Sequence, residues 1–349
     1  MVFSFPPYLT PLGRYTRELL ALLLIALPGF AQTQFPLKLP GEGITVQAVR
    51  SDVPEESFQT EIVNRALKAL GYTIAPTQIA DYLTGYHAIA HGDFTFSTVG
   101  WFPLHSDMYS AAGGRQKLSR QGHFISGAIQ GYMINKSIAD QYDITNIAQL
   151  KDAKLAALFD QDGDGKADLI GCNQGWGCEH VVNVQLGAFG LSDTVTHHQG
   201  DYAHIMKSTI ARFHQNKPVL YYAWKPYWVS SILEPGVDVV WLEVPFSALP
   251  GERQQVKTRL PNGRNFGFEM NSMRIVANRQ FIEENPAAAK LFSIMRIDIN
   301  DIMEQNLKMN QGANRPEDIE RHVDEWLLKN QHRFNRWITR AKQADRDTD

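Results

Sequence analysis

Strand-like and helix-like patterns alternate along this chain, and the alternation restricts the folds open to it. Residues 43–49 (GITVQAV) alternate apolar and polar side chains like a strand. Between Asp52, which we expect to cap a helix, and Gly71, which we expect to end it, apolar side chains recur at helical spacing. Buried-strand patterns return at 94–99 and 218–223. The alternation predicts an α/β fold with parallel sheets, in which ligands bind beyond the carboxyl ends of the strands.

A strand-then-helix pattern occurs at two places where the chain can cross between lobes, residues 131–142 and 273–286. A chain that leaves one lobe and later returns to it forms two lobes with a cleft between them. We place lobe one at residues 36–140 plus 271–349 and lobe two at residues 141–270. Each lobe is expected to be a mostly parallel sheet flanked by helices, with the ligand in the cleft.

The N-terminus has the pattern of an export signal. Arg14 and Arg17 precede the apolar run LLALLLIALPGF (19–30), and small residues precede the expected cleavage after Ala31. We therefore expect residues 1–31 to be removed. The apolar run is too short to span a bilayer comfortably, and no later stretch reaches the required length, so we expect no transmembrane segment.

Composition limits the class of partner. The net charge is -3, 44% of the residues are hydrophobic and 20% are charged, which is typical of a soluble globular protein. Lys and Arg form no stripe, which argues against nucleic acid and anionic membranes as partners. A small molecule is the expected partner.

The stretch GCNQGWGCEH (171–180) contains the only two cysteines, Cys172 and Cys178. In an exported protein we expect them to pair, which stabilises the fold by about 2 kcal/mol for so short a loop. The main effect is then local, because the bond fixes the loop that carries Trp176. The alternatives are two free buried thiols, or a redox or metal pair, although the spacing is neither C-x-x-C nor that of a zinc site.

Three tryptophans lie at expected loop positions, where the side chain can be exposed. Trp101 and Trp224 follow strands, and Trp176 lies between glycines. Aromatic faces attract cations, by roughly 0.5 to 2 kcal/mol each. Three together would form a box for a quaternary ammonium group, which has no hydrogen-bond donor. For any single tryptophan, a place in the core is the commoner outcome. To the core we assign Trp241, Trp326 and Trp337, and Trp228 is left undecided.

The same loop also predicts an anion site. Valines 181, 182 and 184 and Leu186 indicate a helix that begins near Gly177 or Cys178. The first amides of a helix are unpaired and carry partial positive charge, and glycine lets a ligand approach the backbone closely. A ligand with a cation on Trp176 and a carboxylate on these amides is a betaine.

Five segments closely resemble those of the glycine betaine/proline betaine-binding proteins of osmoprotective ABC importers in Gram-negative bacteria. They are WFPLH (101–105), GCNQGWGCE (171–179), YYAWKPYWVS (221–230), VVWLEVPFSALPG (239–251) and NPAAAKLF (285–292). The resemblance runs from about residue 39 to residue 337. It implies a type II periplasmic binding protein fold, a periplasmic location, a monomer and no required cofactor. It also implies delivery of glycine betaine or proline betaine to an inner-membrane permease with a cytoplasmic ATPase.

The resemblance assigns roles to single residues. Trp101, Trp176 and Trp224 match the family's aromatic box, and the Cys172–Cys178 pair matches its disulfide. His105 and the amides of Gly177 and Cys178 match the groups that hold the ligand's carboxylate. Taken alone, His105 would more often be a structural histidine, but it follows Trp101 by four residues on the same loop. Gly100 and Phe102 depart from the family's pattern, which leaves the order of ligand preference open.

The stretch DQDGDGKAD (160–168) is a candidate calcium loop. Its carboxylates at the first, third, fifth and ninth positions match the first part of a calcium-binding loop: Asp160, Asp162, Asp164 and Asp168. The bidentate acid expected at the twelfth position is missing, because Gly171 stands there. A polar surface turn is an equal alternative. Any calcium bound here would be structural.

Three other functions compete with a betaine-binding protein. A binding protein for another quaternary ammonium compound, such as choline or carnitine, would share the aromatic box. An exported enzyme acting on such compounds would too, but the sequence has no GxSxG, HExxH or dinucleotide-binding motif, so we expect no enzyme. An exported thiol–disulfide protein ranks last, because C-x-x-C is missing.

Overall fold

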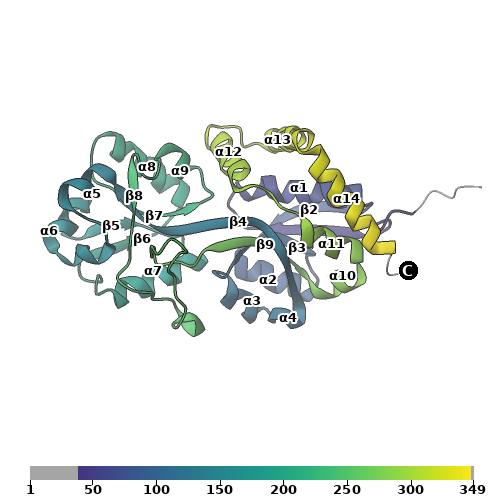
Figure 1. Cartoon of the computed structure of the whole chain (residues 1–349), viewed down its shortest axis with the longest axis horizontal. Helices are drawn as coiled ribbons and strands as arrows, with labels where there is room; N and C mark the ends of the chain where they lie inside the picture. The colour runs from purple at the N-terminus through teal and green to yellow at the C-terminus, as the bar shows by residue number, and fades with distance from the viewer. Residues whose placement is uncertain (1–37, 347–349) are drawn as a thin grey trace, which may run out of the picture. The chain divides into compact units, whose positions relative to one another are not determined.

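The strands form one mixed sheet in residues 38–346, the part of the chain that the computed structural model describes. In chain order they are β1 (Thr45–Arg50), β2 (Thr73–Ile79), β3 (Phe96–Phe102), β4 (Leu118–Asn135), β5 (Ala167–Ile170), β6 (Val195–His198), β7 (Leu220–Lys225), β8 (Val239–Leu242) and β9 (Asn271–Asn278). Across the sheet they are ordered β2-β1-β3-β9-β4-β7-β5-β6, and β8 pairs with β4 beside this path (Figure 1).

Parallel pairing, which the sequence predicts, is found at both ends of this sheet. There β1 runs parallel to β2 and β3, and β5 runs parallel to β6 and β7. The centre differs from the prediction, because the pairs that include β4 or β9 are antiparallel. These two strands lie next to each other in the middle of the sheet.

Helices flank both ends of the sheet, and the predicted α/β class is confirmed (Figure 1). Those beside β1–β3 and β9 are α1 (Glu56–Ala69), α2 (Tyr82–His91), α3 (Ser106–Ala111), α4 (Gly114–Lys117), α10 (Arg279–Glu284), α11 (Pro286–Ile294), α12 (Ile299–Asn310), α13 (Pro316–Lys329) and α14 (Gln331–Arg346). Those on the side of β5–β8 are α5 (Lys136–Tyr142), α6 (Ala153–Ala156), α7 (Gly177–Ala188), α8 (Tyr202–His214) and α9 (Val229–Ile232). Short 3-10 helices lie at Ile147–Lys151, Ala157–Phe159 and Gly251–Arg253.

The strand β4 changes partners along its length of 18 residues. From Leu118 to Ala128 it pairs with β9, and from Ile129 to Asn135 it pairs with β7 and β8. A register shift lies between Ser126 and Ala128, and Gly127 between them has a φ of 81°. A bulge with a left-handed glycine bends a strand, and here it marks where the strand leaves one half of the sheet for the other. The lobe boundaries at residues 140 and 271 stay a prediction.

Buried apolar side chains form separate cores on the two sides of this bend. The larger core is built from residues between Tyr132 and Phe268. A second core combines residues from Val46 to Ile125 with residues from Met273 to Ala341. Half-buried Trp101 packs against both cores, so it lies where the two halves meet.

In the first helix, α1, the predicted apolar face and the predicted end are confirmed, but the predicted N-cap is not. Its apolar positions are buried, with Ile62, Ala66 and Leu67 each 0% exposed, and Gly71 follows its end with a φ of 96°. The predicted cap is wrong, because α1 begins at Glu56 and Glu55 occupies the N-cap position. Pro54 disfavours helical backbone at the residue before it, and residues 53–57 form a turn instead.

The expected export signal, residues 1–31, lies outside the described residues. Within residues 38–346, no helix combines the length and the apolar character needed to cross a bilayer.

Candidate ligand-binding site

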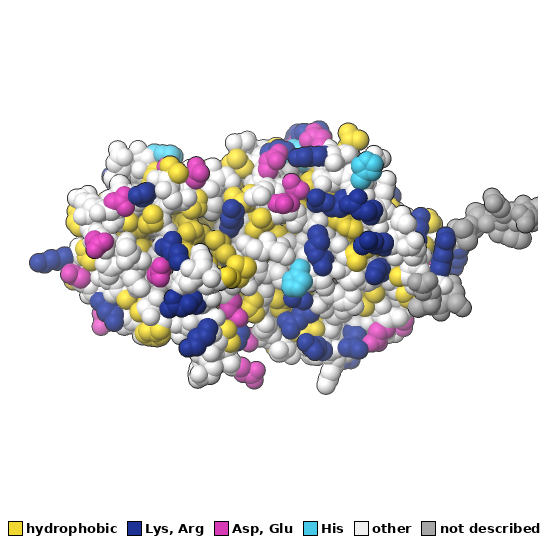
Figure 2. Space-filling model, viewed as in Figure 1, with side chains coloured by type: hydrophobic (Ala, Val, Ile, Leu, Met, Phe, Trp, Pro, Cys, Tyr) yellow, Lys and Arg dark blue, Asp and Glu magenta, His cyan; other side chains and the backbone are white. Residues whose placement is uncertain are grey.

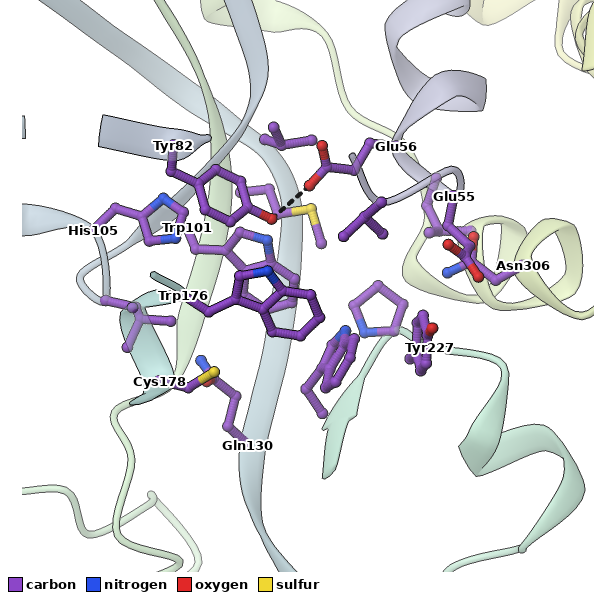
Figure 3. A pocket seen from close by; sticks show the side chains of 18 of the residues that line it. Glu55, Glu56, Tyr82, Trp101, His105, Gln130, Trp176, Cys178, Tyr227 and Asn306 are labelled. Atoms are coloured by element: carbon purple, nitrogen blue, oxygen red, sulfur yellow. Dashed lines mark hydrogen bonds between the residues drawn. The ribbon is translucent and has the colours of Figure 1, made fainter. Parts of the chain in front are cut away.

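A cavity is lined by residues from both halves of the sheet (Figure 3). Its volume is about 600 Å³, which includes the space at its mouth that is open to solvent. All six residues predicted to bind the ligand line it: Trp101, His105, Trp176, Gly177, Cys178 and Trp224. Trp101 and His105 come from β3 and the turn before α3, whereas the other four come from α7, its N-cap and β7. Segments far apart in the sequence therefore meet at one place.

The tryptophans differ in how they are held. Trp101 and Trp224 do not follow their strands, as the sequence suggested, but lie within them. The reason is that pairing continues to the ends of β3 and β7, where Trp101 is opposite Met273 and Trp224 is opposite Gln130. Both indoles are thus fixed by the sheet rather than by a loop.

Trp224 stands in a cluster of aromatic rings. The ring of Trp176 meets it edge-on, with centroids 5.5 Å apart and an interplanar angle of 86°. Tyr227 stacks on it at 4.2 Å, and the Tyr202 and Tyr222 rings lie at 4.8 and 5.7 Å. These tyrosines were not predicted. For Tyr222 and Tyr227 the signal was the density of aromatic residues in YYAWKPYW (221–228), whereas no such cluster surrounds Tyr202 in the sequence.

The other tryptophans were assigned with mixed success. Trp326 and Trp337 are in the core as predicted, 7% and 6% exposed, and their rings stack at 6.2 Å. Trp228, left undecided, is 2% exposed and also belongs to the core. Trp241 is only half-buried at the edge of the larger core.

His105 is buried, at 2% exposure, and has aromatic neighbours. Its Nδ1 lies 3.0 Å from the Tyr86 hydroxyl, and the Tyr82 ring lies 4.6 Å from its own. Burial lowers the pKa of His105 to about 3, and the charge of Arg253 lowers it further. The imidazole is therefore neutral at pH 7. When Nδ1 accepts a hydrogen bond from Tyr86, Nε2 carries the proton and is a donor.

The helix α7 begins at Gly177, as the sequence predicted, with Trp176 as its N-cap. In the described part of the chain, neither the Gly177 amide nor the Cys178 amide has a backbone or side-chain acceptor. His105 lies against this helix start, because a Cβ built on Gly177 would come within 3.2 Å of His105 Cδ2. Two free amides and a neutral imidazole thus converge at one end of the cavity.

The loop before α7 is held in place by covalent and polar contacts. Cys172 and Cys178 form the predicted disulfide, with Cα atoms 6.0 Å apart, so the alternative of two free thiols is wrong. The Cys172 amide donates to His197 Nε2 at 3.1 Å, and the Gly175 amide donates to the Glu179 carboxylate at 2.7 Å. The position of Trp176 is therefore fixed before any ligand arrives.

Two carboxylates on the cavity wall were not predicted, Glu55 and Glu56 (Figure 3). Glu56 accepts hydrogen bonds from the Tyr82 hydroxyl at 2.7 Å and from the Ser51 amide at 2.8 Å. Burial raises the pKa of Glu56 to about 7, more than these donors lower it. Burial also raises the pKa of Glu55, which lies near Tyr227. No motif marks this pair, because acidic residues at a helix start are common for local reasons.

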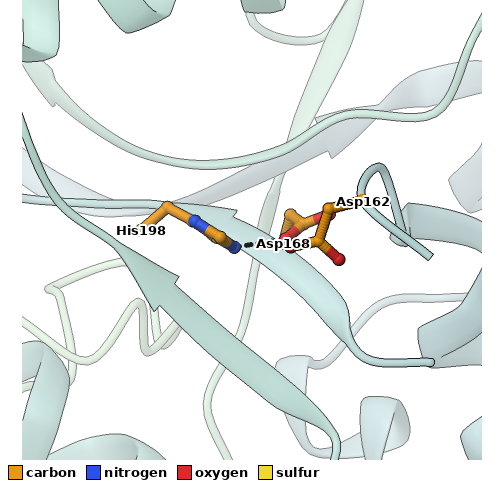
Figure 4. Close-up of side chains that lie close together, drawn as sticks. All are labelled: Asp162, Asp168 and His198. Carbon is orange, nitrogen blue, oxygen red and sulfur yellow. Dashed lines mark ion pairs between the residues drawn. The ribbon is translucent and has the colours of Figure 1, made fainter. Parts of the chain in front are cut away.

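The candidate calcium residues fall into two groups that share Asp162, since its ligand atoms also lie within 4.8 Å of those of Asp168 and His198. Ligand atoms of Asp160, Asp162 and Asp164 lie within 4.8 Å of one another, and Asp160 accepts hydrogen bonds from the Gly163 and Gly165 amides at 2.7 and 2.9 Å. Asp168 is buried and forms an ion pair with His198, which the sequence analysis missed (Figure 4). His198 lies on β6, next to β5, so only strand pairing brings it here. Calcium binding stays a prediction.

A family model confirms what the motifs suggested. The model described as the substrate binding domain of the ABC-type glycine betaine transport system matches residues 44–329. The chain belongs to this family. Its resemblance to glycine betaine/proline betaine-binding proteins, predicted from the five segments, is thereby confirmed.

Curated relatives in this family are similar over most of their length. A glycine betaine-binding periplasmic protein, OusX of Dickeya dadantii (strain 3937), is 56% identical over 306 residues, which cover 88% of this chain and 92% of the relative. A glycine betaine/proline betaine-binding periplasmic protein of Escherichia coli (strain K12) is 55% identical over 312 residues, which cover 89% of this chain and 94% of the relative.

A solved structure shares the fold. The glycine/betaine/L-proline-binding protein (ProX) of a Borrelia burgdorferi ABC transporter superposes with a TM-score of 0.66 at 18% identity, covering 86% of this chain and 99% of that one. The predicted fold class, a two-lobed binding protein, is confirmed by this similarity.

Proposed function

We propose that this chain captures glycine betaine or proline betaine in the periplasm and delivers it to an ABC permease. The observation that carries the proposal is the meeting of three tryptophans, two free helix amides and a neutral histidine around one cavity. Relatives named as periplasmic glycine betaine-binding proteins support the ligand class and the location. Residues 1–31 would then be the export signal. The protein performs no reaction on its ligand, works as a monomer, and requires no cofactor.

The aromatic rings would hold the cationic end of the ligand. Trp176 and Trp224 meet at a right angle, and Trp101 faces the cavity from the other half of the sheet. A trimethylammonium group cannot donate hydrogen bonds, so aromatic faces are its natural receptor, at roughly 0.5 to 2 kcal/mol for each ring. Glu55 and Glu56 also line the cavity, and they add negative charge when they are ionised.

The amides of Gly177 and Cys178, together with His105, would hold the carboxylate. The helix α7 has 12 residues, and its partial positive charge concentrates at the first amides. A neutral His105 donates one hydrogen bond without adding a full charge to a buried site. A zwitterion with a short spacer satisfies both ends of the cavity at once.

Calorimetric titration with a panel of ligands tests the proposal. We expect glycine betaine and proline betaine to bind, and choline to bind far more weakly. Choline has the same cationic head but an alcohol in place of the carboxylate, so it leaves the anion donors poorly paired, at roughly 1 to 3 kcal/mol for each group. Equal affinity for choline and glycine betaine would contradict the carboxylate site. Incubation with both compounds should yield no product; a product would favour an enzyme.

The physiological role follows from the family's transport system. A permease and a cytoplasmic ATPase would take up the released betaine, which protects cells against osmotic stress. At high salt, glycine betaine should no longer rescue the growth of a strain that lacks this protein. The gene supplied in trans should restore this rescue. Rescue by a variant that does not bind betaine would show that osmoprotection does not depend on this binding site.

A further inference from the structure

A second hollow lies beside the strands β3, β4 and β9 and shares no residue with the aromatic cavity. It lies between α3, α4 and α10, and its volume is about 1350 Å³, which includes space that is open to solvent. Four arginines line it: Arg115, Arg120, Arg274 and Arg279. Figure 2 shows Lys and Arg side chains gathered around a histidine over this part of the sheet.

The positive charge of this hollow is not balanced by the residues around it. Among the described residues that line it, Glu283 is the one acidic side chain. Its carboxylate is already paired with Arg279, at 2.7 Å. The other arginines of the hollow form no ion pair within the described chain. The hollow therefore carries excess positive charge.

Arg120 is held rigidly in this hollow by aromatic rings. Its guanidinium carbon lies 4.4 Å from the centroid of Phe102 and 4.6 Å from the centroid of Tyr109. Cation–aromatic stacking fixes the plane of the group and leaves its N–H edge free to bind. The strands explain the position, since Arg120 on β4 is opposite Val276 on β9.

Arg274 is the second half-buried arginine of this hollow. Its Nη2 lies 3.2 Å from His123 Nε2, and its Nε is a buried donor without an acceptor among the described residues. Burial lowers the pKa of Arg274, and the charge of Arg120 lowers it further. Burial also lowers the pKa of His123, with further contributions from Arg274 and Arg296. Both pKa values are lowered in part by neighbouring positive charges, so like charges face one another here.

Like charges held together destabilise a fold unless an anion lies between them. Guanidinium groups match the geometry of oxyanions, to which they donate paired hydrogen bonds. Arg120 and Arg274 are half-buried within a concave surface, which a compact anion reaches more readily than a flat partner protein does. We propose that this hollow binds a small multivalent oxyanion, such as inorganic phosphate or sulfate, through Arg120 and Arg274.

Thermal unfolding and calorimetric titration with sodium phosphate and sodium sulfate test this site, with sodium chloride at matched ionic strength as reference. We expect phosphate or sulfate to raise the unfolding temperature in a saturable way, and chloride not to. Arg120→Gln and Arg274→Gln should each weaken the affinity for the oxyanion at least tenfold. Arg340→Gln removes an exposed charge elsewhere and should leave the affinity unchanged.

Circular dichroism without added anion checks that each variant folds. If Arg274→Gln does not fold, Arg274→Lys keeps the charge but loses the paired donors, and it should still bind more weakly than the parent. No saturable stabilisation by phosphate or sulfate would overturn the proposal, as would equal binding by parent and variants. Stabilisation by poly-glutamate alone would also overturn it, and would indicate a surface for an acidic partner.

Discussion

The ring of Tyr227 stacks on the indole of Trp224, with centroids 4.2 Å apart and ring planes 28° apart. This contact supports one ring of the proposed aromatic box, and Tyr227 lines the same cavity. Replacing Trp101, Trp176 or Trp224 with Ala should each weaken glycine betaine binding by about 1 to 3 kcal/mol, because the cation contact and its buried area are lost together. Calorimetric titration measures the loss.

Two variants serve as controls for the box. Tyr227→Leu should weaken binding less than Trp224→Ala, because it removes one ring of the cavity lining and leaves the indole of Trp224 in place. Trp326→Ala should lower the unfolding temperature and leave the affinity unchanged, since Trp326 is buried in the other core. Parental affinity in all three single tryptophan variants would show that the box is misplaced.

A methyl group at the start of α7 should disturb the carboxylate end. A Cβ on Gly177 would come within 3.0 Å of Leu104 Cγ and 3.2 Å of His105 Cδ2. Gly177→Ala should therefore weaken glycine betaine binding about tenfold, about 1.4 kcal/mol, by keeping His105 from the helix amides. Gly187 lies in the same helix with no atom within 4 Å of such a Cβ, so Gly187→Ala should bind as the parent does. Equal affinities for the two variants would contradict the assignment of the helix start.

The buried carboxyl of Glu56 should make stability depend on pH. Its pKa is about 7 in the folded protein and 4.5 as a free group. The folded state then holds the proton more tightly, so the stabilisation is present below pH 4.5 and is lost as the pH rises through 7. The total is about 3 kcal/mol for a shift of this size.

Chemical unfolding of the parent and of Glu56→Gln across this range measures the effect. The variant has no such proton, so its stability relative to the parent should rise by about 3 kcal/mol from about pH 4 to about pH 8. His105 acts in the opposite sense, since its low pKa makes stability fall as the pH drops below 6.5, but both proteins share it. Tyr82→Phe keeps the carboxyl and removes a donor that lowers its pKa, so its stability should depend on pH at least as steeply as that of the parent. A constant difference between Glu56→Gln and the parent would count against a raised pKa.

The disulfide should matter more for the loop than for the fold. Replacing both Cys172 and Cys178 with Ser should lower the free energy of unfolding by about 2 kcal/mol. It should also weaken glycine betaine binding, because Trp176 and the helix amides lie inside or next to the closed loop. A reducing agent should reproduce both changes in the parent and change nothing in the double variant. Full affinity in the reduced parent would mean that the polar contacts of Cys172 and Gly175 suffice.

Ligand binding should also close the two lobes. Trp101 and His105 come from one half of the sheet and Trp176, Gly177 and Trp224 from the other, so one small ligand contacts all of them only in a closed form. A ligand shifts the population by the difference between its affinities for the two forms. Saturating glycine betaine should reduce the radius of gyration in small-angle X-ray scattering, and His105→Ala should lessen the change at equal ligand concentration. An unchanged profile at proven saturation would argue for rigid lobes.

Local signals in the sequence were enough to predict the parts of the site that lie on one segment. The helix start at Gly177, the Cys172–Cys178 bond and the strand ends near Trp101 and Trp224 each depend on neighbouring residues. What the sequence left out depends on distant pairing. Glu56 meets Tyr82 only because α1 and α2 both pack on β1 and β3, which brings their first residues together, and His198 meets Asp168 only through strand pairing.

The antiparallel centre of the sheet was missed for the same kind of reason. A buried strand has the same apolar pattern whether its neighbour runs parallel or antiparallel, so β4 and β9 show no direction in the sequence. The change of partner at Gly127 was also invisible, because a glycine in a strand can equally mark a weak point or a close contact.

A single strand that belongs to both halves also decides how this protein can be divided. A fragment of residues 141–270 would lack β4, so β8 would lose its partner strand and β7 would keep only β5, with open edges that favour aggregation. A fragment that ends at residue 140 would keep β4 but lose β9, its other neighbour. The halves are therefore not separable modules, and a fluorescent reporter or a split point belongs in an exposed turn, not between the halves.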